Sequence, residues 1–404
     1  MSAPLGGIRV LEVANWLAVP AAGALLTDMG AQTVKVEPPG GEPWRNFRPS
    51  SPDMAVQFPG NPMFELDNRG KRSLTINLDR AEGQETVRRL AERVDIFLTN
   101  LTPSRRERYG LTYADLSPRN PRLIYLGFSG YGNAGPERDR LGFDYAAFWA
   151  RSGIMSLVGE PDVTPPFPRV GMGDHTTAPL LLAGVLAALY ERERSGRGQE
   201  INGSLLNTAL WVLGSDLQAA LVARQEPIRT PRSHAPNPIW NLYRASDGKW
   251  LLLVMPTPEA YWPRVCEAIG RTDLAADPRY STIEGRATHC QELVAALDAA
   301  FASAPRDQWA ERLDAHGLIW APAQSIMDVM DDPQVKANDF LTTVEHPTFG
   351  PYQTIDTPLK FGRSDVKARG AAPEPGQHTE EVLLEAGYTW DELARLRELG
   401  VFGL

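Results

Sequence analysis

The chain has 404 residues, 43% hydrophobic and 23% charged, a composition typical of a globular protein of two or three domains. Its formal net charge of -9 excludes an overall positive field that would hold nucleic acid or an anionic membrane surface, so we expect neither partner. Any polyanionic ligand then needs a local basic patch. Two cysteines without metal-ligand spacing, and an N-terminal run without a basic and apolar leader pattern, predict a cytoplasmic protein.

The first half of the sequence alternates strand-like runs with helical segments. Runs rich in β-branched and apolar residues, typical of buried strands, occupy 8–13, 33–36, 73–78, 95–98 and 123–128. Residues 21–29 and 81–93 have the apolar spacing of helices. This alternation predicts an α/β fold with an open, mostly parallel, Rossmann-like sheet that binds ligands at the C-terminal ends of its strands. The Pro- and Gly-rich but aromatic segment 37–62 predicts an ordered loop over such a site.

The second half is mainly helical. Helices are expected at 143–153, 177–194 and 205–223, then a turn and strand at 247–254, amphipathic helices to about 315, and a terminal helix opened by a capping box from Thr389 to Glu392. The apolar run 178–190 is too short to span a bilayer and predicts a core helix. We predict three parts: 1–224, the N-terminal part of a large α/β domain; 225–330, a smaller α+β domain; and 331–404, a C-terminal segment that returns to the large domain.

Common cofactor and metal motifs are absent from the sequence. A search finds no GxGxxG, GxxxxGK[ST], HExxH or GxSxG pattern. The six histidines never lie three or four residues from one another, so no local metal-binding pair is formed. We expect no metal.

The segment 171–179, Gly-Met-Gly-Asp-His-Thr-Thr-Ala-Pro, places one carboxylate before an apolar helix. One interpretation is structural: Asp174, Thr176 or Thr177 caps the first turn of that helix. The other is functional: the glycines let a substrate carbonyl approach, backbone amides stabilise developing negative charge, and Asp174 is a nucleophile. The pattern alone favours the cap.

Basic residues are scattered through the first domain, several of them just after predicted strands. Solvated faces explain most such charges, but a phosphate-bearing ligand at the strand ends is a second hypothesis. The set is Lys35, Arg45, Arg69, Lys71, Arg72, Arg105, Arg106 and Arg108.

Seven segments in unchanged order carry a resemblance that runs almost from end to end. They are residues 7–13 with Pro20, 30–40, 68–78, 95–110, Gly173-Asp174, 193–199 and 376–382. On these segments the chain resembles the family III CoA-transferases, a group that includes formyl-CoA transferase, carnitine CoA-transferase and α-methylacyl-CoA racemase.

The resemblance implies a CoA-transferase that takes an acyl-CoA and a carboxylic acid as substrates, uses coenzyme A thioesters and no metal, and forms an interlocked homodimer. It implies that Asp174 attacks the thioester, giving an aspartyl mixed anhydride and then an aspartyl-CoA thioester. It also implies a set of CoA-binding residues. These are Trp16, Leu17, Ala18, Lys71, Arg72, Asn100, Leu101, Thr102, Arg108 and Tyr109, with Lys35 or Arg45 reaching the phosphates.

The sequence departs from the family pattern at three places. Leu17 stands where formyl-CoA transferase has a glutamine that helps hold oxalate, and residues 254–258, Val-Met-Pro-Thr-Pro, replace a glycine-rich loop, so oxalate is not the expected acceptor. Phe143 stands where the racemases have a proton-transferring histidine. Aromatic residues near the expected acyl end, Trp16, Trp44, Phe47 and Trp149, favour a bulky, aromatic or cationic acid, with core packing as the alternative.

Two other functions stay open from the sequence. One is a racemase, epimerase or lyase acting on acyl-CoA with different proton chemistry. His175 is a poor substitute base for it, because adjacent residues at a helix start point apart. The other is a non-catalytic CoA-binding protein in which Asp174 only caps a helix.

Overall fold

The computed structural model describes residues 3–47, 58 and 60–403 and divides the chain into two compact units. The first unit contains residues 1–156, 167–224 and 338–404, and the second contains 157–166 and 225–337. The small domain was expected at residues 225–330. The second unit also includes residues 157–166, and it extends to Ala337. Residues 48–57 and 59 of the expected loop over the site lie outside the described residues.

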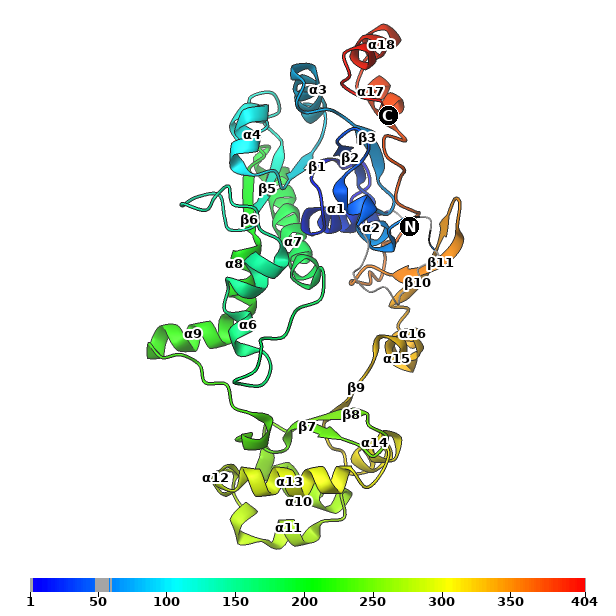
Figure 1. Cartoon of the computed structure of the whole chain (residues 1–404). Coiled ribbons are helices and arrows are strands. Elements are labelled where there is room, and N and C mark those ends of the chain that lie inside the picture. The colour runs from blue at the N-terminus through cyan, green and yellow to red at the C-terminus, as the bar shows by residue number, and fades with distance from the viewer. Residues whose placement is uncertain (1–2, 48–57, 59, 404) are drawn as a thin grey trace. The chain divides into compact units, whose positions relative to one another are not determined.

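The centre of the first unit is a six-stranded parallel sheet with the order β3-β2-β1-β4-β5-β6 (Figure 1). The open parallel α/β fold is therefore confirmed. In register, Leu11 of β1 pairs with Val34 of β2 and with Phe97 of β4. The strand order reverses at β1, so a crevice is expected where β1 and β4 end. The strands are β1 Arg9–Val13, β2 Gln32–Glu37, β3 Arg72–Thr75, β4 Ile96–Thr99, β5 Ile124–Ser129 and β6 Glu200–Ser204.

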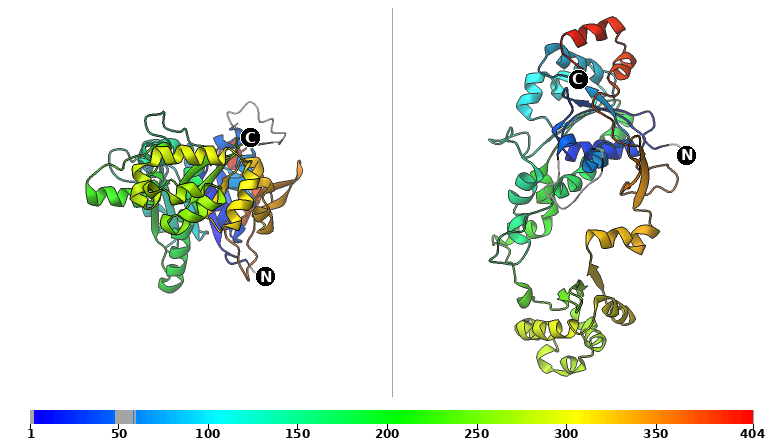
Figure 2. Two further views of the ribbon diagram at one scale, coloured as in Figure 1. Left: turned by 90° about the horizontal axis from the view of Figure 1, so that it is seen from below. Right: turned by 45° about the vertical axis from the view of Figure 1, so that its right-hand side comes forward.

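Helices cover both faces of this sheet, because alternate side chains of each buried strand point to opposite sides. Val10, Ile96 and Leu126 pack into one cluster with α1 (Ala18–Asp28) and α7 (Met172–Ser195). Leu11, Phe97 and Tyr125 pack into another with α3 (Ala81–Ala91) and the C-terminal helices α17 (Thr379–Glu385) and α18 (Trp390–Glu398). Figure 2 shows the C-terminal helices returning to the sheet of this unit.

The remaining elements of the first unit are short. They are η1 Pro43–Asn46, α2 Pro62–Asn68, α4 Pro103–Tyr109, α5 Tyr113–Leu116, the π-helix η2 Tyr145–Ala150, α6 Ile154–Leu157, α8 Leu205–Val212, α9 Gly214–Ala223, and the hairpin of β10 Leu341–His346 and β11 Gly350–Ile355.

The second unit packs helices on an antiparallel three-stranded sheet, β7-β8-β9. Its core joins Tyr243, Leu251 and Leu253 of the sheet to Trp309 and Phe301 of the helices. The elements are η3 Arg232–His234, β7 Trp240–Arg244, β8 Trp250–Val254, α10 Pro258–Ala268, α11 Thr272–Ala276, η4 Pro278–Tyr280, α12 Ile283–Thr288, α13 Cys290–Phe301, α14 Arg306–Ala315, β9 Trp320–Ala323, α15 Ile326–Asp331 and α16 Pro333–Ala337.

Several local expectations have a definite outcome. The capping box is confirmed, since Thr389 and Glu392 accept each other's backbone N–H groups. The single helix expected at 205–223 is wrong: α8 and α9 are separated at Leu213 by a bend of 77°. By length and composition α7 could span a membrane, but its apolar side chains, such as Leu182 and Val185, lie in the core cluster beside the sheet. It is a core helix, as expected.

Candidate active site

The loops after β1 and β4 form the walls of a cavity at the C-terminal edge of the sheet. Asn100 ties the loops together, because its side-chain amide donates to the carbonyl of Asn15 at 2.6 Å and its Oδ1 accepts the Asn15 N–H at 3.1 Å. The cavity measures about 360 Å³. It lies at the place where an open α/β sheet binds its ligand, between the two strands at which the order reverses.

Seven of the residues assigned from the resemblance line this one cavity, although they come from three separate parts of the chain. The loop after β1 and the start of α1 contribute one group, the loop after β4 contributes another, and α7 contributes Asp174. The seven are Trp16, Leu17, Ala18, Asn100, Leu101, Thr102 and Asp174.

The buried side chain of Arg106, in α4, links the loop after β4 to the end of β5. Its guanidinium donates to the carbonyl of Leu101 and to the carbonyl of Phe128, both at 2.6 Å. Gly127 of β5 makes room for it, because a Cβ there would lie 2.5 Å from Arg106 Nη1. The loop that follows β4 and the end of β5 are thus linked by one buried side chain.

Asp174 is the third residue of α7 and does not cap the helix. The N-cap position is Gly171, with a left-handed φ of 79°, and it has no side-chain cap hydrogen bond. The hydroxyls of Thr176 and Thr177 donate to the carbonyls of Met172 and Gly173, one turn earlier. The structural interpretation of this segment as a cap is therefore wrong, and the carboxyl group of Asp174 faces the cavity instead.

The surroundings of Asp174 make its carboxylate basic. Burial and the nearby Asp144 carboxylate raise the pKa of Asp174, His175 opposes both, and the result is a pKa of about 7. Asp144 is itself buried and accepts the N–H of Gly173 at 3.3 Å. A carboxyl group with this pKa is half ionised near neutral pH, which suits a group that must attack a carbonyl and later be released.

His175 is directed away from the carboxyl group of Asp174. Its Nε2 lies 2.8 Å from Oδ1 of the buried Asp67, and both residues line a different, mainly apolar cavity of about 480 Å³. Although burial lowers the pKa of His175, the hydrogen bond to Asp67 and its negative charge raise it overall. The charge of His175 therefore lowers the pKa of Asp174, while its side chain lines the other cavity.

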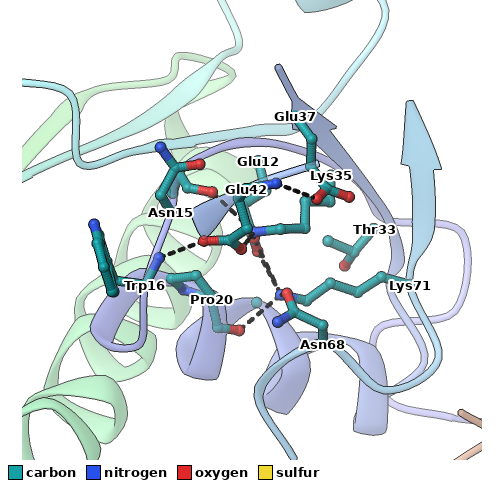
Figure 3. A network of polar contacts seen from close by, with 12 residues as sticks. Glu12, Asn15, Trp16, Pro20, Thr33, Lys35, Glu37, Glu42, Asn68 and Lys71 are labelled. Atoms are coloured by element: carbon teal, nitrogen blue, oxygen red, sulfur yellow. Dashed lines mark hydrogen bonds and ion pairs between the residues drawn. The ribbon is translucent and has the colours of Figure 1, made fainter. Parts of the chain in front are cut away.

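The structure does not support a phosphate-binding role for the buried lysines. Lys35 and Lys71 are fully buried, and both ammonium groups contact the carboxylate of Glu12 (Figure 3). Lys35 also lies 2.7 Å from Glu42, and Lys71 also donates to Pro20 and Asn68. Burial lowers the pKa of Lys71 to about 8, with Glu12 opposing it. The two ammonium groups therefore stabilise the fold, because they neutralise the buried carboxylates of Glu12 and Glu42.

Arg45 and Arg72 are likewise engaged in ion pairs. Arg45 makes two hydrogen bonds to Glu37, at 2.6 and 2.7 Å. Arg72 pairs with Glu381 and Glu385 of α17 at 3.1 and 2.9 Å, so it fastens the C-terminal helix to β3. Neither side chain lines the cavity beside Asp174.

Arg108 and Tyr109 lie next to the cavity. Tyr109 lines a smaller cavity of about 110 Å³, and Asn15, Leu101 and Arg105 line both cavities. Arg108 is 65% exposed and pairs with Asp79 at 2.6 Å, and the hydroxyl of Tyr109 donates to the same carboxylate. Their assignment to CoA stays a prediction.

Sequence reasoning missed several lining residues. Arg138 and Arg140 line the cavity, but a basic residue in a loop gives no sign of facing a ligand, whereas Arg105 belonged to the basic set considered for a phosphate-bearing ligand and does line it. Asp144 does not line the cavity but raises the pKa of Asp174, and no sequence pattern singled it out. Of the four aromatic residues expected near the acyl group, Trp16 lines the cavity, whereas Trp44 is buried and stacks on Phe47.

An open parallel sheet with a carboxylate in the cavity at its switch point is the arrangement of an α/β enzyme whose ligand binds at the strand ends. The model of CoA-transferase family III matches residues 5–379. The chain therefore belongs to CoA-transferase family III, it is an enzyme of that family, and its substrates are CoA thioesters.

Relatives and solved structures agree over nearly the whole chain. The (R)-2-hydroxy-4-methylpentanoate CoA-transferase of Clostridioides difficile is 32% identical, over 98% of this chain and 98% of that protein. The cinnamoyl-CoA:phenyllactate CoA-transferase of Clostridium sporogenes is 33% identical, over 97% and 95%. The crystal structure of a CAIB/BAIF family protein from Brucella suis has a TM-score of 0.84 at 30% identity, covering 96% of this chain and 100% of that one.

Proposed function

We propose that this enzyme transfers CoA through a covalent aspartyl intermediate on Asp174. The observation that carries the proposal is the position of Asp174, a carboxyl group with a raised pKa in the cavity formed by the loops after β1 and β4. Asp174 is half-buried, and a substrate that fills the cavity would exclude the water that competes for an activated acyl group. The same residue was assigned from the resemblance, so two independent arguments agree on it.

The proposed reaction has four acyl-transfer steps, each of which forms one bond and breaks another. A carboxylate oxygen of Asp174 attacks the thioester carbonyl, the carbon–sulfur bond breaks, and CoA leaves as thiolate from a mixed anhydride. The thiolate then attacks the aspartyl carbonyl and releases the donor acid as its carboxylate. The acceptor carboxylate attacks the resulting aspartyl thioester and again frees the thiolate, which takes the new acyl group and restores Asp174.

We further propose that the acceptor is a bulky or aromatic acid. Much of the lining near Asp174 is apolar, including Trp16, Leu17, Phe143 and Leu205. Two relatives are named for phenyllactate and 2-hydroxy-4-methylpentanoate, which are acids of this type. Because Phe143 cannot carry a proton, we expect configuration at the α-carbon to be retained.

A cytoplasmic homodimer is also part of the proposal. The support from this chain is α9, which has no buried residue although it contains Leu221, 50% exposed, and Val222, 76% exposed. Apolar side chains gathered on one exposed helix mark an interaction surface. Light scattering that gave the mass of a single chain at micromolar concentration would rule the dimer out.

The test of the intermediate is intact-protein mass spectrometry after mixing with acyl-CoA thioesters. The wild type is expected to gain the mass of an acyl or CoA group, hydroxylamine is expected to remove it, and Asp174→Ala is expected to gain nothing. Asp67→Ala is a matched carboxylate control, since Asp67 lines the other cavity. An adduct of equal size in Asp174→Ala would place the chemistry elsewhere.

The pH dependence provides a second prediction. Because Asp174 attacks as a carboxylate and its pKa is about 7, kcat/KM is expected to rise with pH up to about 7 and then level off. Asp144→Asn removes a charge that raises this pKa, so the rise should move to lower pH. His175→Gln removes a charge that lowers it, so the rise should move to higher pH. Equal profiles in all three proteins would contradict the electrostatic description.

Arg105 is expected to bind the phosphates of CoA. Its side chain borders both cavities, where a long ligand would cross from one to the other. Arg105→Ala should raise KM for the thioester by about tenfold with little change in kcat, because a charge-assisted hydrogen bond is lost. Arg119→Ala is the matched control, since Arg119 lies outside both cavities and pairs with Glu85 and Glu92. Equal effects of the two variants at one ionic strength would contradict this assignment.

A further inference from the structure

The backbone of Trp16 has a conformation that bulky residues rarely adopt. Its φ is 68°, in the left-handed region. Such a conformation persists only where its surroundings hold it. Here the N–H of Trp16 donates to Oε2 of Glu42 at 2.6 Å.

The Glu42 carboxylate is itself fixed in place. Glu42 is fully buried, and its other oxygen lies 2.7 Å from Nζ of Lys35. Lys35 in turn contacts Glu12 at 3.0 Å and donates to the carbonyl of Ala14 at 2.8 Å, two residues before Trp16 (Figure 3). The acceptor for the Trp16 N–H is therefore anchored to the same strand end that carries the turn.

The turn determines where the indole lies. The Trp16 ring contacts Phe143 edge-on with ring centroids 5.0 Å apart, and lies 6.0 Å from Trp44. Trp16 and Phe143 both line the cavity that contains Asp174. A change of backbone conformation at Trp16 would swing the indole out of this wall.

We propose that Glu42 is a positioning residue for CoA transfer: its carboxylate holds the left-handed turn at Trp16 and thereby sets the aromatic wall of the cavity beside Asp174. This rests on the proposed function only in taking that cavity as the substrate site. Glu42 acts through Trp16 and not on the reacting atoms. Its loss should therefore weaken substrate binding more than it slows the chemical steps.

The test compares Glu42→Ala with Glu42→Gln. In the alanine variant the Trp16 N–H loses its acceptor, and KM for the thioester should rise by about tenfold while kcat falls by less than about threefold. Glutamine keeps an oxygen that can accept this N–H, so its KM should return towards that of the wild type even though the ion pair with Lys35 is lost.

Glu65→Ala is the matched control. Glu65 is also buried and its Oε2 accepts a backbone N–H, that of Ala372, at 2.7 Å, but it does not line the cavity. It should lower the denaturation midpoint without changing KM. If KM followed the loss of stability in both alanine variants alike, Glu42 would be merely structural and the inference would be overturned.

A double-mutant cycle with Trp16→Gly tests the route of action. Glycine adopts a positive φ without strain and has no indole to place. Glu42→Ala should therefore raise KM no further in the Trp16→Gly background, whereas additive effects would overturn the inference. Failure of the aspartyl mechanism would instead appear as an adduct persisting in Asp174→Ala, a result that leaves this cycle unaffected.

Discussion

Replacing Asp174 by Asn is expected to lower kcat for CoA transfer by about 10⁴-fold or more, because an amide cannot form the anhydride on which every later exchange depends. The measurement is steady-state turnover with an acyl-CoA donor and an acceptor acid, with CoA binding measured alongside. CoA should still bind, since the residues of the loops after β1 and β4 are unchanged. A variant that turned over at a tenth of the wild-type rate would exclude Asp174 as the nucleophile.

The same substitution has an expected effect on stability, whose sign follows from the pKa. In the folded protein the pKa of Asp174 is about 7, above its ordinary value of 3.8. As pH rises from about 4 to 7, the unfolded chain releases this proton and the folded protein retains it, so the wild type loses stability. Asp174→Asn should therefore be more stable than the wild type at pH 8, with the difference vanishing towards pH 4. Urea denaturation at the two pH values measures it.

Lys71→Met is expected to lower the free energy of unfolding by about 3–5 kcal/mol, because it leaves the buried Glu12 carboxylate with one cation instead of two. Lys71 is fully buried and contacts Glu12, Pro20 and Asn68 at 2.8–2.9 Å. Urea denaturation measures the loss. KM for the thioester should change little in the folded fraction.

Lys360→Met provides the comparison for Lys71. Lys360 pairs with Asp356 at 2.6 Å but is 46% exposed, so its loss should cost less than about 1 kcal/mol. If Lys71→Met instead raised KM strongly and left stability at the wild-type level, Lys71 would contact CoA, as the resemblance implied.

Strands buried on both sides were predictable from the sequence, as was β8 with its run of leucines, whereas β6 and β7 were not. β4 is apolar up to Thr99, and apolar residues flank the charged residues Glu12 in β1 and Lys35 in β2, a pattern typical of buried parallel strands. β6, with Asn and Gly in its centre, lies at the edge of the sheet and has no such pattern. β7 alternates exposed and buried residues after a Pro-rich turn, which concealed it.

Site residues were predictable where their position follows from the end of a strand. They were not predictable where their role depends on the direction of the side chain. Loop residues such as Asn100 and Leu101 follow strand ends, so their place at the sheet edge follows from topology. Lys35 and Lys71 were expected at a phosphate because the sequence does not reveal that Glu12 lies between them. Arg105 lines the cavity, whereas its neighbour Arg106 is buried and donates hydrogen bonds to two backbone carbonyls.

The contacts of Arg106 also limit motion at the cavity. One guanidinium bonds the carbonyls of Leu101 and Phe128, so the loop after β4 can move away from the end of β5 only if a buried charge loses an acceptor. Amide hydrogens in the loop after β4 should therefore exchange more slowly than those in the largely exposed loop that follows β5.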